Sequence, residues 1–332
     1  MYKSNNSKRI FITGGAGYVG AVLIPKLLQR CYHVTVLDLM IYGEDVIKPH
    51  EHLTMVRGDI RDLDLLNQII VGHDIVIHLA CISNDPSFEL NPDLGKSINL
   101  DAFEPLVALS KRSGVSRFIY ASSSSVYGVK QERNVHEEMS LEPLTDYSKF
   151  KASCESILMN FESPNFTPVT IRPATVCGYS PRQRLDVVVN ILTNLAFHKR
   201  EISVFGGNQL RPNIHIDDMA DAYIAVIEAD AARISGQIFN VGTENQTVLE
   251  LAETVRSVVG MDVRLVTSPS SDNRSYHISS KKIADMLGFV PSRSIAQASS
   301  DIKRALEAGL LPNSLTDERF FNIKRMQSLK LI

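Results

Sequence analysis

The feature that most constrains this sequence is a glycine-rich turn between a short apolar strand and a helix. Residues 9–13 (RIFIT) have strand composition, and residues 18–30 have the apolar spacing of a helix. Between them, GGAGYVG at residues 14–20 contains G-x-G-x-x-G. Side chains there would block the turn, the approach of a pyrophosphate, or helix–strand packing, so the pattern predicts a dinucleotide site. The backbone contacts expected at the phosphates are those of Gly14, Gly17, Tyr18 and Val19.

Short apolar strands alternate with helical patterns through the first half of the chain. The strands expected are 9–13, 33–38, 53–57, 74–78, 117–121 and 167–171, and the helices are 18–30, 63–70, 96–113 and 146–161. Such alternation predicts a parallel sheet covered on both faces, with right-handed connections. The expected fold class is α/β: a doubly wound parallel-sheet Rossmann domain with a smaller interleaved α/β substrate lobe.

The pattern changes beyond Arg172. Helices are expected at 185–199 and 218–229, strands at 201–205, 214–216 and 237–241, and a mainly helical tail at 248–310. We predict that residues 1–178 form the NAD-binding domain, with 213–245 returning to it. Residues 179–212 and 246–332 form the predicted substrate-binding lobe.

A carboxylate selects the dinucleotide. Asp38 ends the second strand, 18 residues beyond Gly20. There it can accept the ribose hydroxyls and would repel a 2′-phosphate, and no arginine follows at residues 39–41, so NAD is favoured over NADP. Asp59 and Ile60 follow the third strand, where adenine is expected, although a turn or cap role fits Asp59 as well. Leu79 and Ala80 follow the fourth strand and are expected beside the pyrophosphate and ribose.

Composition argues against several other classes of protein. The net charge of −2 gives no bulk attraction for nucleic acid or an anionic membrane. The four cysteines lack metal-ligand spacing, so we expect neither a metal site nor a disulfide framework. The polar N-terminus has no signal-peptide core, and no apolar run approaches the roughly 20 residues of a membrane span. The expected location is the cytoplasm.

The catalytic hypothesis begins with Tyr147 and Lys151, which lie four residues apart in a helical pattern. They share one helix face, so the lysine cation and a nicotinamide would both favour the phenolate. That phenolate can take a hydroxyl proton while hydride leaves for NAD. Serines at residues 122–125 end a strand at the ligand-binding edge of the sheet and can hydrogen-bond the reacting oxygen.

Together these motifs resemble the extended short-chain dehydrogenase/reductase family, in its sugar-nucleotide epimerase/dehydratase branch. The resemblance spans nearly the whole chain, through GGAGYVG, HLAC, INLDAF, SSSSVYG, YSKFKASCE, IRPATVCG, RPNIHIDD and FNVG. It implies Ser123 as the catalytic hydroxyl, Tyr147 as base and Lys151 as the residue that tunes it and holds the nicotinamide ribose. It also implies that Asn99 organises the site, that Arg211 and Arg274 hold a nucleotide diphosphate, and that helices 96–113 and 146–161 form a homodimer.

The resemblance also limits which of the family's reactions we expect this chain to catalyse. The family's 4,6-dehydratases follow this Ser/Thr with Asp-Glu, whereas this chain has Ser124-Ser125, and two hydroxyls cannot replace an acid and a base. We therefore expect hydride transfer at sugar C4, with 4-epimerisation ahead of net 4-dehydrogenation or 4-keto reduction. A non-sugar carbonyl reductase and a non-catalytic NAD-sensing protein are the remaining alternatives.

Two departures from the family bear on the substrate. Thr175 stands where the family usually has Asn, and the following segment is unusually polar for a helix entrance. This segment resembles enzymes that modify lipopolysaccharide or capsule sugars, including heptoses, which implies a nucleotide-sugar for a surface polysaccharide. The substrate contacts expected are Ser83, Asn84, Ser124, Thr175, Arg182, Asp186 and Asn190, although Ser83 and Asn84 fit equally well as turn residues.

Overall fold

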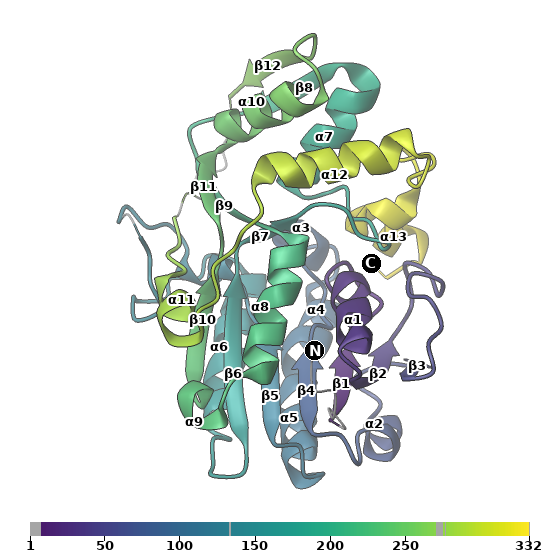
Figure 1. Ribbon diagram of the computed structural model, residues 1–332, viewed down its shortest axis with the longest axis vertical. Helices are drawn as coiled ribbons and strands as arrows, with labels where there is room; N and C mark the ends of the chain where they lie inside the picture. The colour runs from purple at the N-terminus through teal and green to yellow at the C-terminus, as the bar shows by residue number, and fades with distance from the viewer. Residues whose placement is uncertain (1–7, 133, 270–274, 276, 332) are drawn as a thin grey trace.

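The computed structural model describes residues 8–132, 134–269, 275 and 277–331. Its main element is a seven-stranded sheet in the order β10-β6-β5-β4-β1-β2-β3 (Figure 1). All six strand pairs are parallel, which confirms the predicted doubly wound α/β sheet. The strands are β1 (Arg9–Thr13), β2 (His33–Asp38), β3 (Leu53–Arg57), β4 (Ile75–His78), β5 (Arg117–Ala121), β6 (Thr167–Pro173) and β10 (Gln237–Val241).

Alternate residues of these strands feed two separate cores. In β1, Ile10 and Ile12 pack in one buried cluster, whereas Phe11 packs in another. Because successive strand side chains point to opposite faces, both faces of the sheet need a covering layer. On the first face lie α1 (Gly20–Gln29) and α8 (Ile216–Glu228), and on the second lie α2 (Leu63–Ile69), α5 (Phe103–Arg112) and α6 (Asp146–Met159).

A smaller layer lies beyond the carboxyl ends of the strands (Figure 1). There α7 (Val188–Lys199), α10 (Val248–Val259) and α12 (Ile295–Glu307) share a third core with the paired strands β8 (Glu201–Phe205) and β12 (Arg264–Ser268). A three-stranded sheet joins β7 (Thr175–Cys177), β9 (Leu210–His215) and β11 (Glu244–Thr247). Shorter helices are α3 (Asp85–Phe88), α4 (Pro92–Lys96), α9 (Ala231–Ile234), α11 (Lys281–Leu287) and α13 (Asn322–Ser328).

The structure corrects several element boundaries. The predicted helix 96–113 is divided into a π-helical turn, Ser97–Asp101, followed by α5. The helix predicted from residue 185 begins at Val188, and the strand predicted at 214–216 is the end of the longer β9. The predicted helical tail contains β12, which forms because Arg264–Ser268 pairs with the distant β8. The boundaries proposed for the two lobes remain a prediction.

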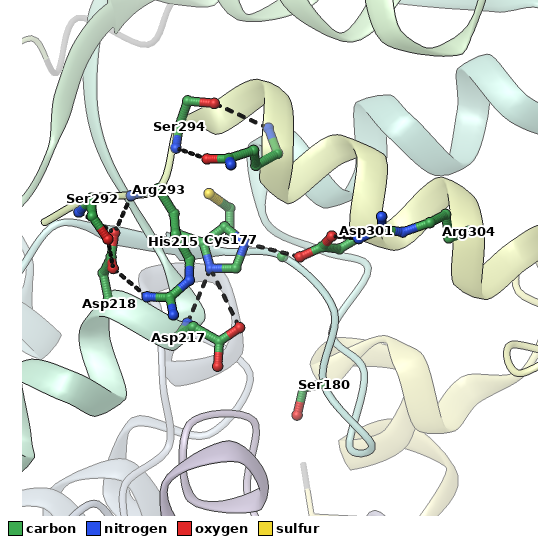
Figure 2. Close-up of polar contacts among 12 residues, drawn as sticks. Cys177, Ser180, His215, Asp217, Asp218, Ser292, Arg293, Ser294, Asp301 and Arg304 are labelled. Atoms are coloured by element: carbon green, nitrogen blue, oxygen red, sulfur yellow. Dashed lines mark hydrogen bonds and ion pairs between the residues drawn. The ribbon is translucent and has the colours of Figure 1, made fainter. Parts of the chain in front are cut away.

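The end of β9 joins α8 to α12 (Figure 2). His215 Nδ1 accepts a hydrogen bond from the Asp217 backbone N–H at 3.1 Å, and His215 Nε2 lies 3.0 Å from Asp301 Oδ2. Although His215, Asp217 and Asp301 offer three ligand-type atoms within 4.8 Å, both imidazole nitrogens are already engaged inside the protein. We therefore interpret this cluster as a structural junction. Within the described part of the chain, no helix combines the length and the apolar character needed to cross a bilayer.

Candidate functional site

A cavity of about 590 Å³ lies at the carboxyl edge of the main sheet. Its wall includes residues that follow β1, β2, β3, β4, β5 and β6, as expected for the crevice of a doubly wound sheet. Most of the residues singled out from the sequence line it: Gly14, Gly17, Tyr18, Val19, Asp38, Asp59, Ile60, Leu79, Ala80, Ser83, Asn84, Ser123, Ser124, Tyr147, Lys151, Thr175, Arg182, Asp186 and Arg211.

The glycine turn is tightly packed against the strand ends. Gly14 has φ +73°, and a Cβ added there would lie 2.5 Å from the Ala80 backbone nitrogen. A Cβ at Gly20 would lie 2.1 Å from the carbonyl oxygen of Gly15. Among the described residues no side chain caps the N-terminus of α1, so the positive end of the helix dipole lies at the glycine turn without a competing side chain. These features fit a dinucleotide pyrophosphate.

Asp38 lies at the end of β2, where the predicted ribose contact belongs. Its two carboxylate oxygens accept the backbone N–H groups of Ala16 at 3.0 Å and Met40 at 2.7 Å. Burial raises the pKa of Asp38, and these two hydrogen bonds oppose the rise because they favour the carboxylate.

Asp59 combines the two roles considered for it. It lines the cavity, and its carboxylate also accepts the Arg61 backbone N–H at 2.8 Å and forms an ion pair with the Arg61 guanidinium at 2.6 Å. Hydrogen bonding to Arg61 holds the pKa of Asp59 below its ordinary value. The residue that caps α2 is Asp62.

The structure brings Ser123, Tyr147 and Lys151 together. Tyr147 lies in the first turn of α6, which begins with a capping box formed by Thr145 and Ser148. Tyr147 and Ser123 both line the cavity, and the Ser123 hydroxyl acts to lower the pKa of the Tyr147 phenol. The Lys151 ammonium donates to the Ala121 carbonyl at 2.6 Å and lies 5.8 Å from the centre of the Tyr147 ring.

The electrostatics of Tyr147 differ from the sequence expectation. Burial raises the pKa of Tyr147, and Cys81 and Asp85 raise it further. Arg184 and the Ser123 hydroxyl oppose this rise in the pKa, whereas the sequence had pointed to Lys151. The Lys151 ammonium instead donates to the Ala121 carbonyl.

Asn99 supports the loop that follows β4. It is buried in the π-helical turn, where its side-chain oxygen accepts the Ile82 N–H at 2.8 Å and its amide donates to the Ile82 carbonyl at 2.9 Å. A π-turn adds a residue to the helix and re-aims its side chains. The two hydrogen bonds agree with the organising role that the family resemblance implied.

Beyond that loop, Ser83 and Asn84 are engaged within the protein. Ser83 Oγ accepts from the Asn322 amide at 2.9 Å. Asn84 has φ +78° and caps α3 by accepting the Ser87 N–H at 3.0 Å. The turn role considered for Asn84 is therefore present, alongside its position on the cavity wall.

The basic segment before α7 folds as a loop on the cavity wall. Arg184 forms an ion pair with Asp186 at 2.6 Å, and the Arg182 guanidinium stacks on the Tyr42 ring with its Cζ 3.5 Å from the ring centre. Asn190 was expected one helical turn from Asp186 on a substrate-facing strip, but α7 begins only at Val188.

Asn190 consequently lies outside the cavity wall. Its side chain is fully buried, accepts the Gly178 N–H at 3.0 Å, and donates to the Tyr18 hydroxyl at 2.9 Å and the Arg184 carbonyl at 2.7 Å. It holds the loop in place. Arg274, expected to bind diphosphate, lies outside the described residues.

Thr175 and Arg211 come from adjacent strands of the three-stranded sheet. Thr175 pairs with Asn213 at the start of β7, and Arg211 lies in β9 with a guanidinium hydrogen bond to the Leu210 carbonyl at 3.0 Å. Both line the cavity. Other lining residues belong to no motif that the sequence shows, and they include Tyr42, Asp85, Arg184, Asn322 and Met326.

Behind the site, a buried ion pair fixes the helix that carries Tyr147. The Arg172 guanidinium binds both oxygens of Glu155, one turn beyond Lys151 in α6, at 3.0 and 2.6 Å. Arg172 also donates to the Tyr127 hydroxyl at 2.7 Å. Because both charges are buried, each depends on the other for compensation.

Comparison with known proteins places this geometry in a family. Residues 10–242 match the model of the NAD dependent epimerase/dehydratase family. The chain is 28% identical over 306 residues to a dTDP-glucose 4,6-dehydratase from Streptomyces niveus, covering 85% of this chain and 88% of the relative. It is 26% identical over 331 residues to a UDP-glucose 4-epimerase from Yersinia pestis, covering 88% and 95%. The fold matches a dTDP-glucose 4,6-dehydratase from Streptomyces venezuelae, solved with NAD bound, at TM-score 0.81 and 22% identity, covering 93% and 100%.

Proposed function

Since the chain belongs to the NAD-dependent epimerase/dehydratase family, we propose that it is a nucleotide-sugar 4-epimerase. The observation that supports this most directly is that Ser123, Tyr147 and Lys151 line the same cavity as the glycine turn. The two serines after Ser123 distinguish the site from that of a dehydratase.

In this proposal, bound NAD supplies a hydride acceptor and, in the return step, a hydride donor. Tyr147 takes the proton of the sugar C4 hydroxyl and later returns it, while Ser123 hydrogen-bonds the same oxygen. Because burial raises the pKa of Tyr147, its phenolate depends on positive charge from Arg184 and the oxidised cofactor. Lys151 holds the nicotinamide ribose, and Asp38 the adenosine ribose.

The carboxylates of the cavity give little support to dehydration, which needs an acid and a base beside the sugar. Among the described lining residues, Asp38 and Asp59 lie at the cofactor end, and Asp186 is paired with Arg184. Asp85 accepts a hydrogen bond from Thr145 at 2.5 Å and influences Tyr147, but one carboxylate cannot fill both roles.

The proposed substrate is a nucleotide-sugar of surface polysaccharide synthesis, for which a heptose is one candidate sugar. Arg211 is assigned to the diphosphate, and Ser83, Asn84, Ser124 and Thr175 to the sugar side of the cavity. The relatives compared above act on dTDP-glucose and UDP-glucose by name, which supports this substrate class. We further propose a cytoplasmic homodimer that packs through α5 and α6.

A net 4-dehydrogenase or 4-keto reductase would use the same three residues, so the products must separate these reactions. The experiment incubates the purified protein with GDP-, UDP-, CDP- and dTDP-sugars and follows NADH absorbance together with product stereochemistry. An epimerase gives inversion at C4 with no net NADH. Stoichiometric NADH with a keto-sugar indicates a dehydrogenase instead, and turnover confined to simple ketones indicates a non-sugar reductase.

Two variants connect the activity to the site. Tyr147→Phe removes the proton-transfer group and should lower kcat/KM by about 10²–10⁴-fold. Tyr32→Phe is the matched control, because Tyr32 is buried just before β2, at the opposite end of the sheet from the cavity. Equal activity of the two variants would remove Tyr147 from the mechanism.

A further inference from the structure

The C-terminal helix α13 contributes to the cavity wall, although it is far in sequence from the other lining segments. Asn322, Met326 and Leu331 all face the cavity. Figure 1 shows α13 near the upper end of α1, where the glycine turn lies. The α13 segment thus lies against the proposed dinucleotide site.

Asn322 ties two loops of the cavity together. Its backbone N–H donates to Asp186 Oδ2 at 2.9 Å, its side-chain amide donates to Ser83 Oγ at 2.9 Å, and its side-chain oxygen accepts from Arg182 at 2.7 Å. Asn322 is only 3% exposed, so these bonds form away from solvent. One residue therefore joins the loop after β4 to the loop before α7.

Arg325 fixes the same helix to a third segment. Its Nε donates to the Ile41 carbonyl at 2.5 Å, and its guanidinium pairs with Glu318 at 2.5 Å. Ile41 lies three residues beyond Asp38, the predicted ribose contact. The helix consequently connects three of the segments between which a dinucleotide would lie.

Arg182 places a buried positive charge on the wall of the cavity. It is 4% exposed and, within the described residues, contacts the Tyr42 ring and the Asn322 amide but forms no ion pair. Its Nε has no hydrogen-bond partner among the described residues, and the carboxylates that act on it, Asp38 and Asp186, do so without a direct ion pair. A buried guanidinium whose donors and charge are only partly met is costly. Arg182 lies against the Tyr42 ring, four residues beyond Asp38 in the chain, and it also acts electrostatically on Asp38, so it belongs to the cofactor end of the cavity.

We propose that α13 and Arg182 form a clasp over the bound dinucleotide, in which Arg182 meets its pyrophosphate and opening of α13 limits its release. The inference rests on the proposed function in taking that dinucleotide as NAD. It reassigns Arg182 from the substrate to the cofactor. A clasp of this kind keeps one dinucleotide in place between oxidation and reduction of the same sugar.

The test is the rate of NADH release, measured by stopped-flow fluorescence after mixing the NADH-loaded protein with excess NAD. Asn322→Ala and Arg325→Ala should each release NADH at least about tenfold faster, because each removes one tie of α13. Gln327→Ala, an exposed position in the same helix, should release it at the wild-type rate. Arg182→Gln should weaken NADH binding, and adding Asn322→Ala to it should have less effect than in the wild type.

The outcomes distinguish failure of the clasp proposal from failure of the 4-epimerase proposal. Unchanged release in both Asn322→Ala and Arg325→Ala, with unfolding midpoints like the wild type, overturns the clasp, as does a wild type that binds no NADH. Arg325 is only partly buried, so its variant serves as the folded test should Asn322→Ala unfold. Faster release in a protein that converts no nucleotide-sugar supports the clasp while rejecting the 4-epimerase proposal.

Discussion

Replacing Gly14 by alanine tests whether the glycine turn is shaped by backbone contact. In Gly14→Ala the new Cβ would lie 2.5 Å from the backbone nitrogen and 2.6 Å from the Cα of Ala80, both of which belong to the chain after β4. These are backbone atoms, so no side-chain rotation can relieve the overlap. The φ of +73° adds the cost of a left-handed conformation for an L-residue.

The two costs can be separated by a matched control. Gly72 has φ +79° with no atom within 4 Å of an added Cβ, so Gly72→Ala bears only the conformational cost of about 1–2 kcal/mol. Gly14→Ala bears the same cost plus about 1–3 kcal/mol for overpacking. The free energy of unfolding should therefore fall by about 2–5 kcal/mol in Gly14→Ala, as measured by urea denaturation.

The same variant should bind NAD more weakly, because relief of the overlap must separate two segments that line the cavity. We expect the Kd measured by titration calorimetry to rise at least about tenfold, equivalent to about 1.4 kcal/mol. Gly72→Ala should bind as the wild type does. If Gly14→Ala unfolds like Gly72→Ala and retains wild-type affinity, the close contact with Ala80 does not shape the site.

Three further predictions concern the framework of the site. Burial lowers the pKa of His78 to about 3, so this group should reduce the free energy of unfolding by about 2 kcal/mol as the pH falls from about 7 to about 5. In His78→Gln, urea unfolding should show a pH dependence that is smaller by this amount. Glu155→Gln leaves the buried Arg172 guanidinium without its counter-charge and should cost about 3 kcal/mol or more in urea unfolding; a cost below about 1 kcal/mol would contradict the argument. Asn99→Ala removes both hydrogen bonds to Ile82 and should cost about 1–3 kcal/mol while lowering turnover, whereas unchanged turnover would show that the loop holds its position without Asn99.

Local sequence patterns were sufficient to predict the parts of the site that lie at the ends of strands. The glycine turn, Asp38 and the segment after β4 each follow a strand of a parallel sheet, so their convergence at one edge follows from the fold class alone. Tyr147 and Lys151 were placed together by helical spacing. Helical spacing did not predict where the Lys151 ammonium points, because that depends on the Ala121 carbonyl of a neighbouring strand.

Segments without a strong hydrophobic periodicity were predicted less accurately from the sequence. The polar stretch before α7 contains arginines and acids that fit either a solvated helix entrance or a loop, and its contacts with Asn322, Tyr18 and Tyr42 fix it as a cavity wall. The strand β12 was hidden in a tail of helical composition, because its hydrogen bonds go to β8, some sixty residues earlier in the chain.

The sequence by itself determined the parallel sheet, the dinucleotide turn and the tyrosine–lysine pair, because strand and helix periods and the steric demand for glycine act over a few residues. Only the tertiary structure decided that Asn190 supports a loop, that Arg182 lies against the Tyr42 ring, and that α13 lines the cavity. Those outcomes depend on hydrogen bonds and buried charges between segments more than a hundred residues apart, for which no local pattern exists.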